Sequence, residues 1–302
     1  MNVAIPEEDD ARNIQAGERI LLIDSKDRRY LITLAASGMF STHAGIVHHD
    51  EIIGQLEGCE VVAHQRDESR KSTRVLLVLR PTLSDLILKM PRGAQVIYPK
   101  DLGAILMAAD LFPGAKVLEA GVGSGALSMA ALRAGCIVRG YEIREDFANR
   151  ALANVRDLFG EGASYVVEVR DVYEGIDERG LDRILLDLPE PWRVLDHARN
   201  ALVPGGIICA YLPSINQTAE FRSALDRGDY EFAETFEILR RTWHIEGRSV
   251  RPDHRMVAHT GFLTTARRVP GRTRRRRAAD TALEGASFSS DEAVANAFES
   301  EI

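Results

Sequence analysis

The sequence predicts an α/β fold in which a parallel sheet follows a small N-terminal β-rich domain. Residues 18–90 contain short spans of alternating apolar and polar residues with polar turns between them, a pattern typical of hairpins. From about residue 100 onward, short apolar segments alternate with amphipathic ones, which is typical of strands and helices in a parallel sheet. We therefore expect two domains, residues 1–90 and 91–268, followed by a separate tail over 269–302.

The first domain is expected to consist of hairpins and to end in a helix. Alternation predicts its strands at 19–23, 30–34, 60–65 and 74–79. The helix is predicted over 81–89, where Leu83, Leu86 and Ile87 share one face.

The second domain is expected to contain five parallel strands with right-handed helical crossovers. The strands are predicted at 116–120, 137–141, 165–169, 183–187 and 206–211. The helices are predicted near 101–110, 124–133, 145–158, 192–202 and 216–226. Candidate strands around 231–246 and 260–268 would add antiparallel partners at one edge. Ligands of such sheets bind beyond the carboxyl ends of the strands.

The composition is that of a globular protein, since 45% of the 302 residues are hydrophobic and 27% are charged. No apolar run of about 18 residues is present, and the first ten residues are acidic where a signal peptide would be basic and then apolar. We therefore expect a cytoplasmic protein without a membrane segment. Cys59, Cys136 and Cys209 are far apart, which favours reduced thiols. The histidines lack metal-ligand spacing, so no metal is expected.

The formal net charge of −7 argues weakly against a nucleic-acid partner, but the charge is unevenly distributed. Residues 267–277 carry seven arginines and no acid, whereas 278–302 carry six acids and no Lys or Arg. The tail is expected to be disordered, Arg-rich at first and then acidic. A nucleic-acid site on the folded part must therefore be a local basic patch.

The most informative segment is KVLEAGVGSGALSMA, residues 116–130. An apolar strand runs into a glycine-rich turn, which then becomes a helix. Gly121, Gly123 and Gly125 allow the backbone to turn tightly and to approach a ligand where a Cβ would collide. The segment therefore predicts the binding site of a nucleotide-like cofactor.

The identity of that cofactor is open at this point. Gly121, Gly123 and Ala126 satisfy the dinucleotide fingerprint, so a nicotinamide or flavin enzyme is an alternative. Glu119 favours a different ligand, because a carboxylate two residues before the turn suits a cationic or hydroxylated group and not a pyrophosphate.

Two further acids follow predicted strands. Glu142 comes directly after the strand at 137–141 and stands 21 residues after Gly121, the spacing of a carboxylate that accepts both hydroxyls of a ribose. A nicotinamide enzyme has the same feature, so Glu142 does not discriminate. Asp171 follows the strand at 165–169 and would reach an adenine amino group.

The segment DLPEPW, residues 187–192, is the second strong signal. A buried strand ends in Asp187, two prolines restrict the loop, and Trp192 opens the next helix. The segment resembles the D/N-P-P-aromatic motif of methyltransferases that act on amino nitrogens, but Leu188 and Glu190 depart from that motif.

Taken together, these segments resemble the bacterial and archaeal tRNA (adenine-58-N1)-methyltransferases over roughly residues 15–268. The E-x-G-x-G-x-G turn is similar to motif I of class I S-adenosylmethionine-dependent methyltransferases. The other similar segments are GMFSTH at 38–43, IYPKD at 97–101, DLPEPW, AYLP at 210–213 and AHTGFL at 258–263. The resemblance implies a Rossmann-like methyltransferase sheet, S-adenosyl-L-methionine as cofactor, tRNA as substrate and a homotetramer.

The resemblance also implies roles for individual residues. Asp187 would hold the N6 amino group of adenine and stabilise the cation that forms when N1 is methylated, and Tyr98 would pack near the base or the methyl group. Glu119 would meet the methionine end of the cofactor or support the residues that contact it. The full set of implied cofactor-binding residues is Glu119, Gly121, Gly123, Ser124, Gly125, Ala126, Leu127, Glu142, Asp171 and Asp187.

Substrate contacts are expected from a segment in which arginines and aromatic residues interleave, residues 240–255, since this suits phosphate contacts and base stacking. The candidate substrate-binding residues are Trp192, Arg248, Arg251 and His259. Two rival functions are a methyltransferase for a small molecule, which would not need this basic segment, and a catalytically silent RNA-binding subunit. The silent subunit would be expected to lack Glu142 or Asp187, and both are present.

Overall fold

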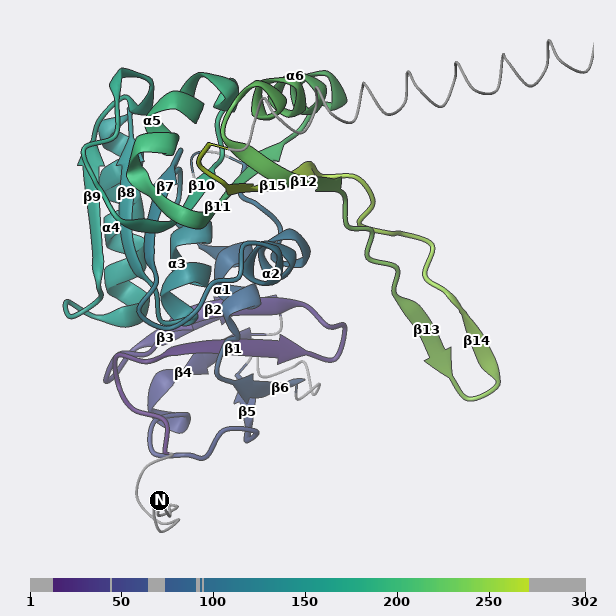
Figure 1. Ribbon diagram of the computed structural model, residues 1–302. Helices are drawn as coiled ribbons and strands as arrows, with labels where there is room; N and C mark the ends of the chain where they lie inside the picture. Colours follow the sequence, from purple (N-terminus) through teal and green to yellow (C-terminus); the bar gives the residue numbers. More distant parts are fainter. Residues whose placement is uncertain (1–12, 44, 65–73, 91–92, 94, 272–302) are drawn as a thin grey trace, which may run out of the picture. The chain divides into compact units, whose positions relative to one another are not determined.

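The computed structural model describes residues 13–43, 45–64, 74–90, 93 and 95–271. It divides into two compact units, residues 1–90 and 91–302, which are described separately (Figure 1). The tail was expected to be disordered. From residue 272 onward it lies outside the described part of the chain, so this expectation stays a prediction.

The first unit contains a four-stranded antiparallel sheet in the order β2-β1-β6-β5. The strands are β1 (Arg19–Asp24), β2 (Arg29–Thr33), β5 (Glu60–Ala63) and β6 (Arg74–Leu79), and α1 (Leu83–Lys89) ends the unit. Alternate residues of β1 and β6, among them Ile20, Leu22 and Leu76, are fully buried in its core. Thr82 and Asp85 form a capping box that starts α1.

A second hairpin of the first unit was not predicted from the sequence. It consists of β3 (Met39–Thr42) and β4 (Gly45–His48), followed by the short 3₁₀ helix η1 (His49–Glu51). Each strand has only four residues, and most of them are only partly buried. Strands of this length show too few alternations to be recognised by pattern.

The second unit is built on a seven-stranded sheet in the order β12-β15-β11-β10-β7-β8-β9. Its parallel strands are β7 (Lys116–Ala120), β8 (Ile137–Glu142), β9 (Tyr165–Val169), β10 (Leu181–Leu186) and β11 (Leu202–Leu212). The predicted parallel strands are all present, and the predicted fold class is confirmed.

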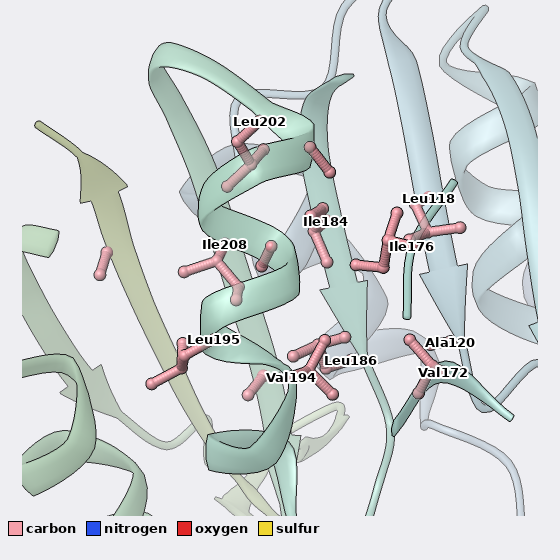
Figure 2. Close-up of a cluster of buried hydrophobic side chains, with 14 of the residues drawn as sticks. Leu118, Ala120, Val172, Ile176, Ile184, Leu186, Val194, Leu195, Leu202 and Ile208 are labelled. Atoms are coloured by element: carbon pink, nitrogen blue, oxygen red, sulfur yellow. The ribbon is translucent and has the colours of Figure 1, made fainter. Parts of the chain in front are cut away.

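Helices follow most of these strands. They are α2 (Pro99–Ala108), α3 (Ala126–Arg133), α4 (Glu145–Phe159), α5 (Leu195–Ala201) and α6 (Ile215–Arg227), and the 3₁₀ helix η3 (Pro191–Val194) precedes α5. Between β9 and β10 the described chain forms only the 3₁₀ helix η2 (Val172–Glu174). Figure 2 shows the core in which α5 packs on β10, with Ile184, Leu186 and Leu195 among the buried side chains.

Antiparallel strands complete one edge of the sheet, as expected. They are β12 (Tyr230–Phe236) and β15 (Phe262–Arg268). The expectation of a strand around 231–246 is only partly correct, because pairing with β15 ends at Phe236, opposite Leu263. Beyond this point an isolated bridge between Arg240 and Val257 joins the two chain segments.

Residues 237–261, which we call the arm, leave the sheet at this point. Within the arm, β13 (Trp243–Glu246) and β14 (Ser249–Pro252) pair only with each other. The arm projects from the edge of the second unit's sheet (Figure 1). No helix in the described ranges has the length and apolar character that spanning a bilayer requires.

Candidate active site

The candidate site lies at the carboxyl edge of three neighbouring strands. β7 pairs with β10 on one side and with β8 on the other, and the register places Ala120 beside both Leu186 and Tyr141. Glu142 and Asp187, which end or follow these strands, are therefore brought to one edge of the sheet, as the sequence predicted.

The glycine turn has a backbone that most residues would not adopt. Gly121, Gly123 and Gly125 have φ angles of +82°, +56° and +83°, in the left-handed region that glycine tolerates. At Gly121 there is a second requirement, since a Cβ there would collide with the backbone carbonyl of Asp187. The turn and the loop after β10 consequently lie in direct contact.

A pocket opens between this turn and the segment that precedes α2. Its lining contains two carboxylates, Glu119 and Asp187, and no lysine or arginine; the other lining residues are Gln95, Val96, Ile97, Gly121, Val122, Gly123, Ser124, Ala126 and Leu127. The hydroxyl oxygen of Ser124 is buried and has no hydrogen-bond partner within the described structure. A buried polar group of this kind is a candidate ligand contact.

Glu119 lies within β7 and is fully buried, with 1% of its surface exposed. The Ser128 hydroxyl on α3 donates to its carboxylate at 2.5 Å, and the Tyr165 hydroxyl lies 2.9 Å from the Ser128 oxygen. Burial raises the pKa of Glu119 to about 8, against the opposing effect of the Ser128 hydrogen bond. Burial therefore favours the protonated form of this carboxyl group in the ligand-free protein.

Asp187 is part of the pocket lining and is only partly accessible to solvent. Its amide donates to the Ala120 carbonyl at 3.0 Å, which fixes the start of the loop. Burial raises the pKa of the Asp187 carboxyl to about 7, and the negative charge of Glu142 adds to this effect. A cation in the pocket would reverse the balance and favour the carboxylate.

Glu142 connects two turns at the edge of the sheet. Its carboxylate accepts from the amide of Gly123 at 2.9 Å and from the amide of Arg144 at 3.0 Å. Each carboxylate oxygen keeps a lone pair beyond these bonds. The side chain is thus held in place at the second strand end, where the sequence placed a ribose acceptor.

Two other predicted residues have structural contacts of their own. The Asp171 carboxylate caps η2 by accepting from the amide of Tyr173 at 2.9 Å. Trp192 is partly buried and packs against the hydrophobic core beside α5. Neither residue is part of the pocket lining given above, and their proposed ligand contacts remain predictions.

Tyr98 is the N-cap residue of α2, directly after the pocket wall formed by residues 95–97. It is half-buried. Burial raises the pKa of the nearby Tyr211 hydroxyl to about 12, and the charges of Asp101, Asp187 and Tyr98 contribute to the increase. Tyr98 and Asp187 are therefore both within electrostatic range of Tyr211, at the end of β11.

The remaining predicted substrate residues lie on the arm. Arg248 lies in the turn between β13 and β14, and Arg251 stands opposite His244; both arginines are exposed. His259 uses both ring nitrogens internally, one 2.8 Å from Glu237 and the other 3.2 Å from the carbonyl of Pro213. The contact with Glu237 raises the pKa of His259, with the Pro213 carbonyl adding to the effect.

Sequence reasoning missed the groups that support this site. Ser128, Tyr165 and the Lys100–Asp101 pair were not identified as functional. One signal was available for Ser128, because a hydroxyl residue interrupts the apolar stripe of α3 nine positions after Glu119. Over the described ranges, no group of three or more His, Cys, Asp or Glu side chains could hold a metal ion.

A family model described as the tRNA methyltransferase complex GCD14 subunit matches residues 74–296, and one described as TrmI-like N-terminal matches residues 13–62. The chain belongs to this family. This membership confirms the resemblance inferred from the glycine turn and the DLPEPW loop.

Individual relatives agree with the assignment. The chain is 36% identical over 253 residues to tRNA (adenine(58)-N(1))-methyltransferase TrmI of Thermus thermophilus, a match covering 82% of this chain and 96% of the relative. Among solved structures it is similar to a SAM-dependent O-methyltransferase from Thermotoga maritima, at 32% identity and a TM-score of 0.80, covering 86% of this chain and 96% of that one. It is also similar to tRNA (m1A58) methyltransferase TrmI from Aquifex aeolicus, at 28% identity and a TM-score of 0.73, covering 85% and 99%.

The contact between Gly121 and the Asp187 carbonyl can be tested with a matched pair of variants. Gly121→Ala and Gly123→Ala both place a side chain at positive φ, but only the first meets a backbone oxygen. We expect Gly123→Ala to cost about 1 kcal/mol of unfolding free energy, and Gly121→Ala to cost clearly more and to weaken ligand binding. Thermal unfolding and calorimetric titration measure both effects. Equal losses in the two variants would contradict the proposed contact.

The raised pKa of Asp187 predicts a pH-dependent stability. The folded, ligand-free protein keeps this proton up to about pH 7, whereas the unfolded chain loses it near the ordinary value of 3.8. The unfolded state therefore binds fewer protons between these values, and the free energy of unfolding falls as pH rises from about 4 to about 7.

Asp187→Asn removes this contribution. We expect its melting temperature to exceed that of the unmodified protein by a margin that grows from pH 5 to pH 8. The control is Asp196→Asn, at a carboxylate with 88% of its side chain exposed. A margin that stays constant with pH would show that Asp187 is not destabilised by burial.

Proposed function

We propose that this chain transfers a methyl group from S-adenosyl-L-methionine to N1 of adenosine 58 in tRNA. The observation that carries the proposal is the lining of the pocket beside the glycine turn, which contains the carboxyl groups of Glu119 and Asp187 and no cationic residue. S-adenosylmethionine bears a sulfonium and an ammonium, and these positive charges would favour the ionised form of both carboxyl groups. A pyrophosphate would be repelled, which argues against the nicotinamide alternative.

The residues of the pocket fit this cofactor. At Gly123 the space beside the backbone is open, and the unpartnered hydroxyl of Ser124 supplies a polar contact. Glu142 would hold the ribose hydroxyls, and Glu119 the methionine end. The Asp171 carboxylate, which accepts from the Tyr173 amide, would also accept a hydrogen bond from the adenine amino group.

When bound, the cofactor supplies an electrophilic methyl group. N1 of adenine carries a lone pair and no proton, so it needs positioning and no strong general base. Asp187 would accept a hydrogen bond from the N6 amino group and hold N1 toward the methyl group. Its carboxylate would then stabilise the positive charge that develops on the base, while Tyr98 covers the base from the start of α2.

A methyltransferase for a small molecule is the second candidate, since the similar structure from Thermotoga maritima is named an O-methyltransferase. An oxygen acceptor requires removal of a proton, and Asp187, with a pKa of about 7, is suited to that step as well. The exposed arginines of the arm favour tRNA, because a small acceptor would leave them without a role.

The arm has two chemically different faces. Trp243 and Ile245 stand opposite Pro252 and Val250, so these four residues share one face of the hairpin. Trp243, Ile245 and Val250 are 56%, 73% and 60% exposed. A two-stranded hairpin is only marginally stable alone, and such an apolar face marks an interaction site.

We infer that the apolar face of the arm contacts a second copy of this chain in the proposed homotetramer. Arg251 and His244 point to the opposite face by the same alternation, which leaves them available for tRNA phosphates. The target base lies in folded tRNA, so it must be extruded into the pocket. A tRNA substrate also agrees with a cytoplasmic location.

The function is tested by incubation with labelled cofactor and an unmodified tRNA transcript, followed by mapping of the modified base. We expect label at adenosine 58 and none in a transcript with guanosine at that position. Asp187→Asn is expected to lose most turnover and to keep cofactor binding, whereas Glu142→Ala weakens cofactor binding. Glu145→Gln, an exposed acid at the start of α4, is the control. Failure to methylate any tRNA adenine would refute the proposal.

The arm predicts a change in oligomeric state. Ile245→Ser together with Val250→Ser removes apolar surface at a cross-strand pair, and we expect dissociation into smaller species in analytical ultracentrifugation. Arg251→Ala, on the opposite face, should leave the assembly intact and weaken tRNA binding. An unchanged sedimentation coefficient for the double variant would rule out this interface.

A further inference from the structure

A buried ion pair stands where the arm joins the sheet. The Lys100 ammonium is buried, with 4% of its side chain exposed, and it donates to the Asp101 carboxylate at 2.7 Å, to the Ile238 carbonyl at 2.7 Å and to the Thr260 hydroxyl oxygen at 2.6 Å. The Thr260 hydroxyl in turn donates to the other carboxylate oxygen of Asp101 at 2.6 Å. All three donor positions of the ammonium are therefore used.

The partners of Lys100 belong to the two ends of the arm. Ile238 lies just after β12, where the chain enters the arm, and Thr260 lies just before β15, where it returns. The amide of Arg240 also donates to the Val257 carbonyl, at 3.0 Å, one step further along. A single ammonium group thus holds both ends of the arm against the first turn of α2.

The same turn of α2 carries a candidate catalytic residue. The Tyr98 carbonyl accepts from the amides of Asp101 and Leu102, so the position of Tyr98 is linked to that of the ion pair. The preceding residues, 95–97, form one wall of the pocket. On the other side, Tyr211 donates to the Thr260 carbonyl at 2.7 Å, and Gly261 is kept small because a Cβ would collide with the Tyr211 ring.

A buried ion pair contributes little net stability, because desolvation of the two charges offsets their attraction. The pair does favour one geometry over others, since moving either group away would leave a buried charge without its partner. The arrangement is therefore better suited to fixing the relative positions of three segments than to stabilising the fold.

We propose that Lys100 and Thr260 are positioning residues that fix Tyr98 and the pocket wall relative to the base of the arm. A shift of the base of the arm would therefore also shift Tyr98 and the pocket wall at the site of methyl transfer. Neither side chain touches the reacting atoms. The inference rests on the proposed function for its kinetic test, but its structural test does not depend on the identity of the substrate.

The decisive variant is Thr260→Val, which removes one hydroxyl and leaves both charges in place. Its matched control is Thr264→Val in β15, which breaks another threonine hydrogen bond, the 2.9 Å contact with Thr235. Thr264 is buried and Thr260 is partly buried, so the loss of stability is measured for each variant by thermal unfolding and compared with its loss of kcat. Thr260→Ser keeps the hydroxyl and serves as the rescue variant. Lys100→Met is a harsher test that leaves Asp101 buried without its cation.

We expect Thr260→Val to lower kcat at least ~10-fold, as a misplacement of about 1 Å would, with cofactor affinity unchanged. Thr264→Val should have little effect on kcat, and Thr260→Ser should restore it. Hydrogen exchange should become faster at the amides of Arg240, Asp101 and Leu102 in Thr260→Val alone. These amides report on the arm and on the turn that holds Tyr98.

Two results would overturn the inference. One is an equal loss of kcat in Thr260→Val and Thr264→Val, which would make the effect a matter of stability. The other is faster exchange confined to the arm, which would show that the ion pair does not connect it to α2. If the unmodified protein methylates no tRNA, the proposed function fails, and the exchange comparison alone decides the inference.

Discussion

The close approach of Gly121 to the Asp187 carbonyl is the constraint on which the site depends. Adjacent strands β7 and β10 end side by side. The segments that follow them approach this closely only because Gly121 has no Cβ. The hydrogen bond from the Asp187 amide to Ala120 closes the arrangement. The turn that would hold the cofactor and the acid that would hold the base are therefore in direct contact.

The parallel sheet and its carboxyl edge were predictable because their signals are local. Each strand from β7 to β11 is an apolar run flanked by turn residues, and parallel strands bring residues such as Glu142 and Asp187 to one edge irrespective of sequence distance. The glycines of the turn predict its backbone conformation directly, since few other residues adopt positive φ. These features needed no knowledge of long-range contacts.

The arm and the ion pair at its base were not predictable in the same way. Pairing of β12 with β15 ends at Phe236, and a strand pattern does not show where pairing with its neighbour stops. In the sequence, Lys100 is a charged residue near the start of a predicted helix, and no local pattern marks it as part of a buried ion pair. Its partners lie about 140 and 160 positions away along the chain, and only the fold brings them together. The first unit's β3–β4 hairpin was too short to show a period.

The raised pKa of Asp187 has a consequence for the whole catalytic cycle. In the proposed reaction the methyl group carries its positive charge from sulfur to the adenine ring, so Asp187 faces one unit of positive charge both before and after transfer. The protein dipoles around it need not reorient as the bond forms. Once both products have left, the carboxyl group returns to its raised pKa of about 7, at which about half of the molecules hold the proton at neutral pH. Binding of the cationic cofactor would thus release a proton from the fraction of molecules that hold one, and departure of the products would allow its uptake.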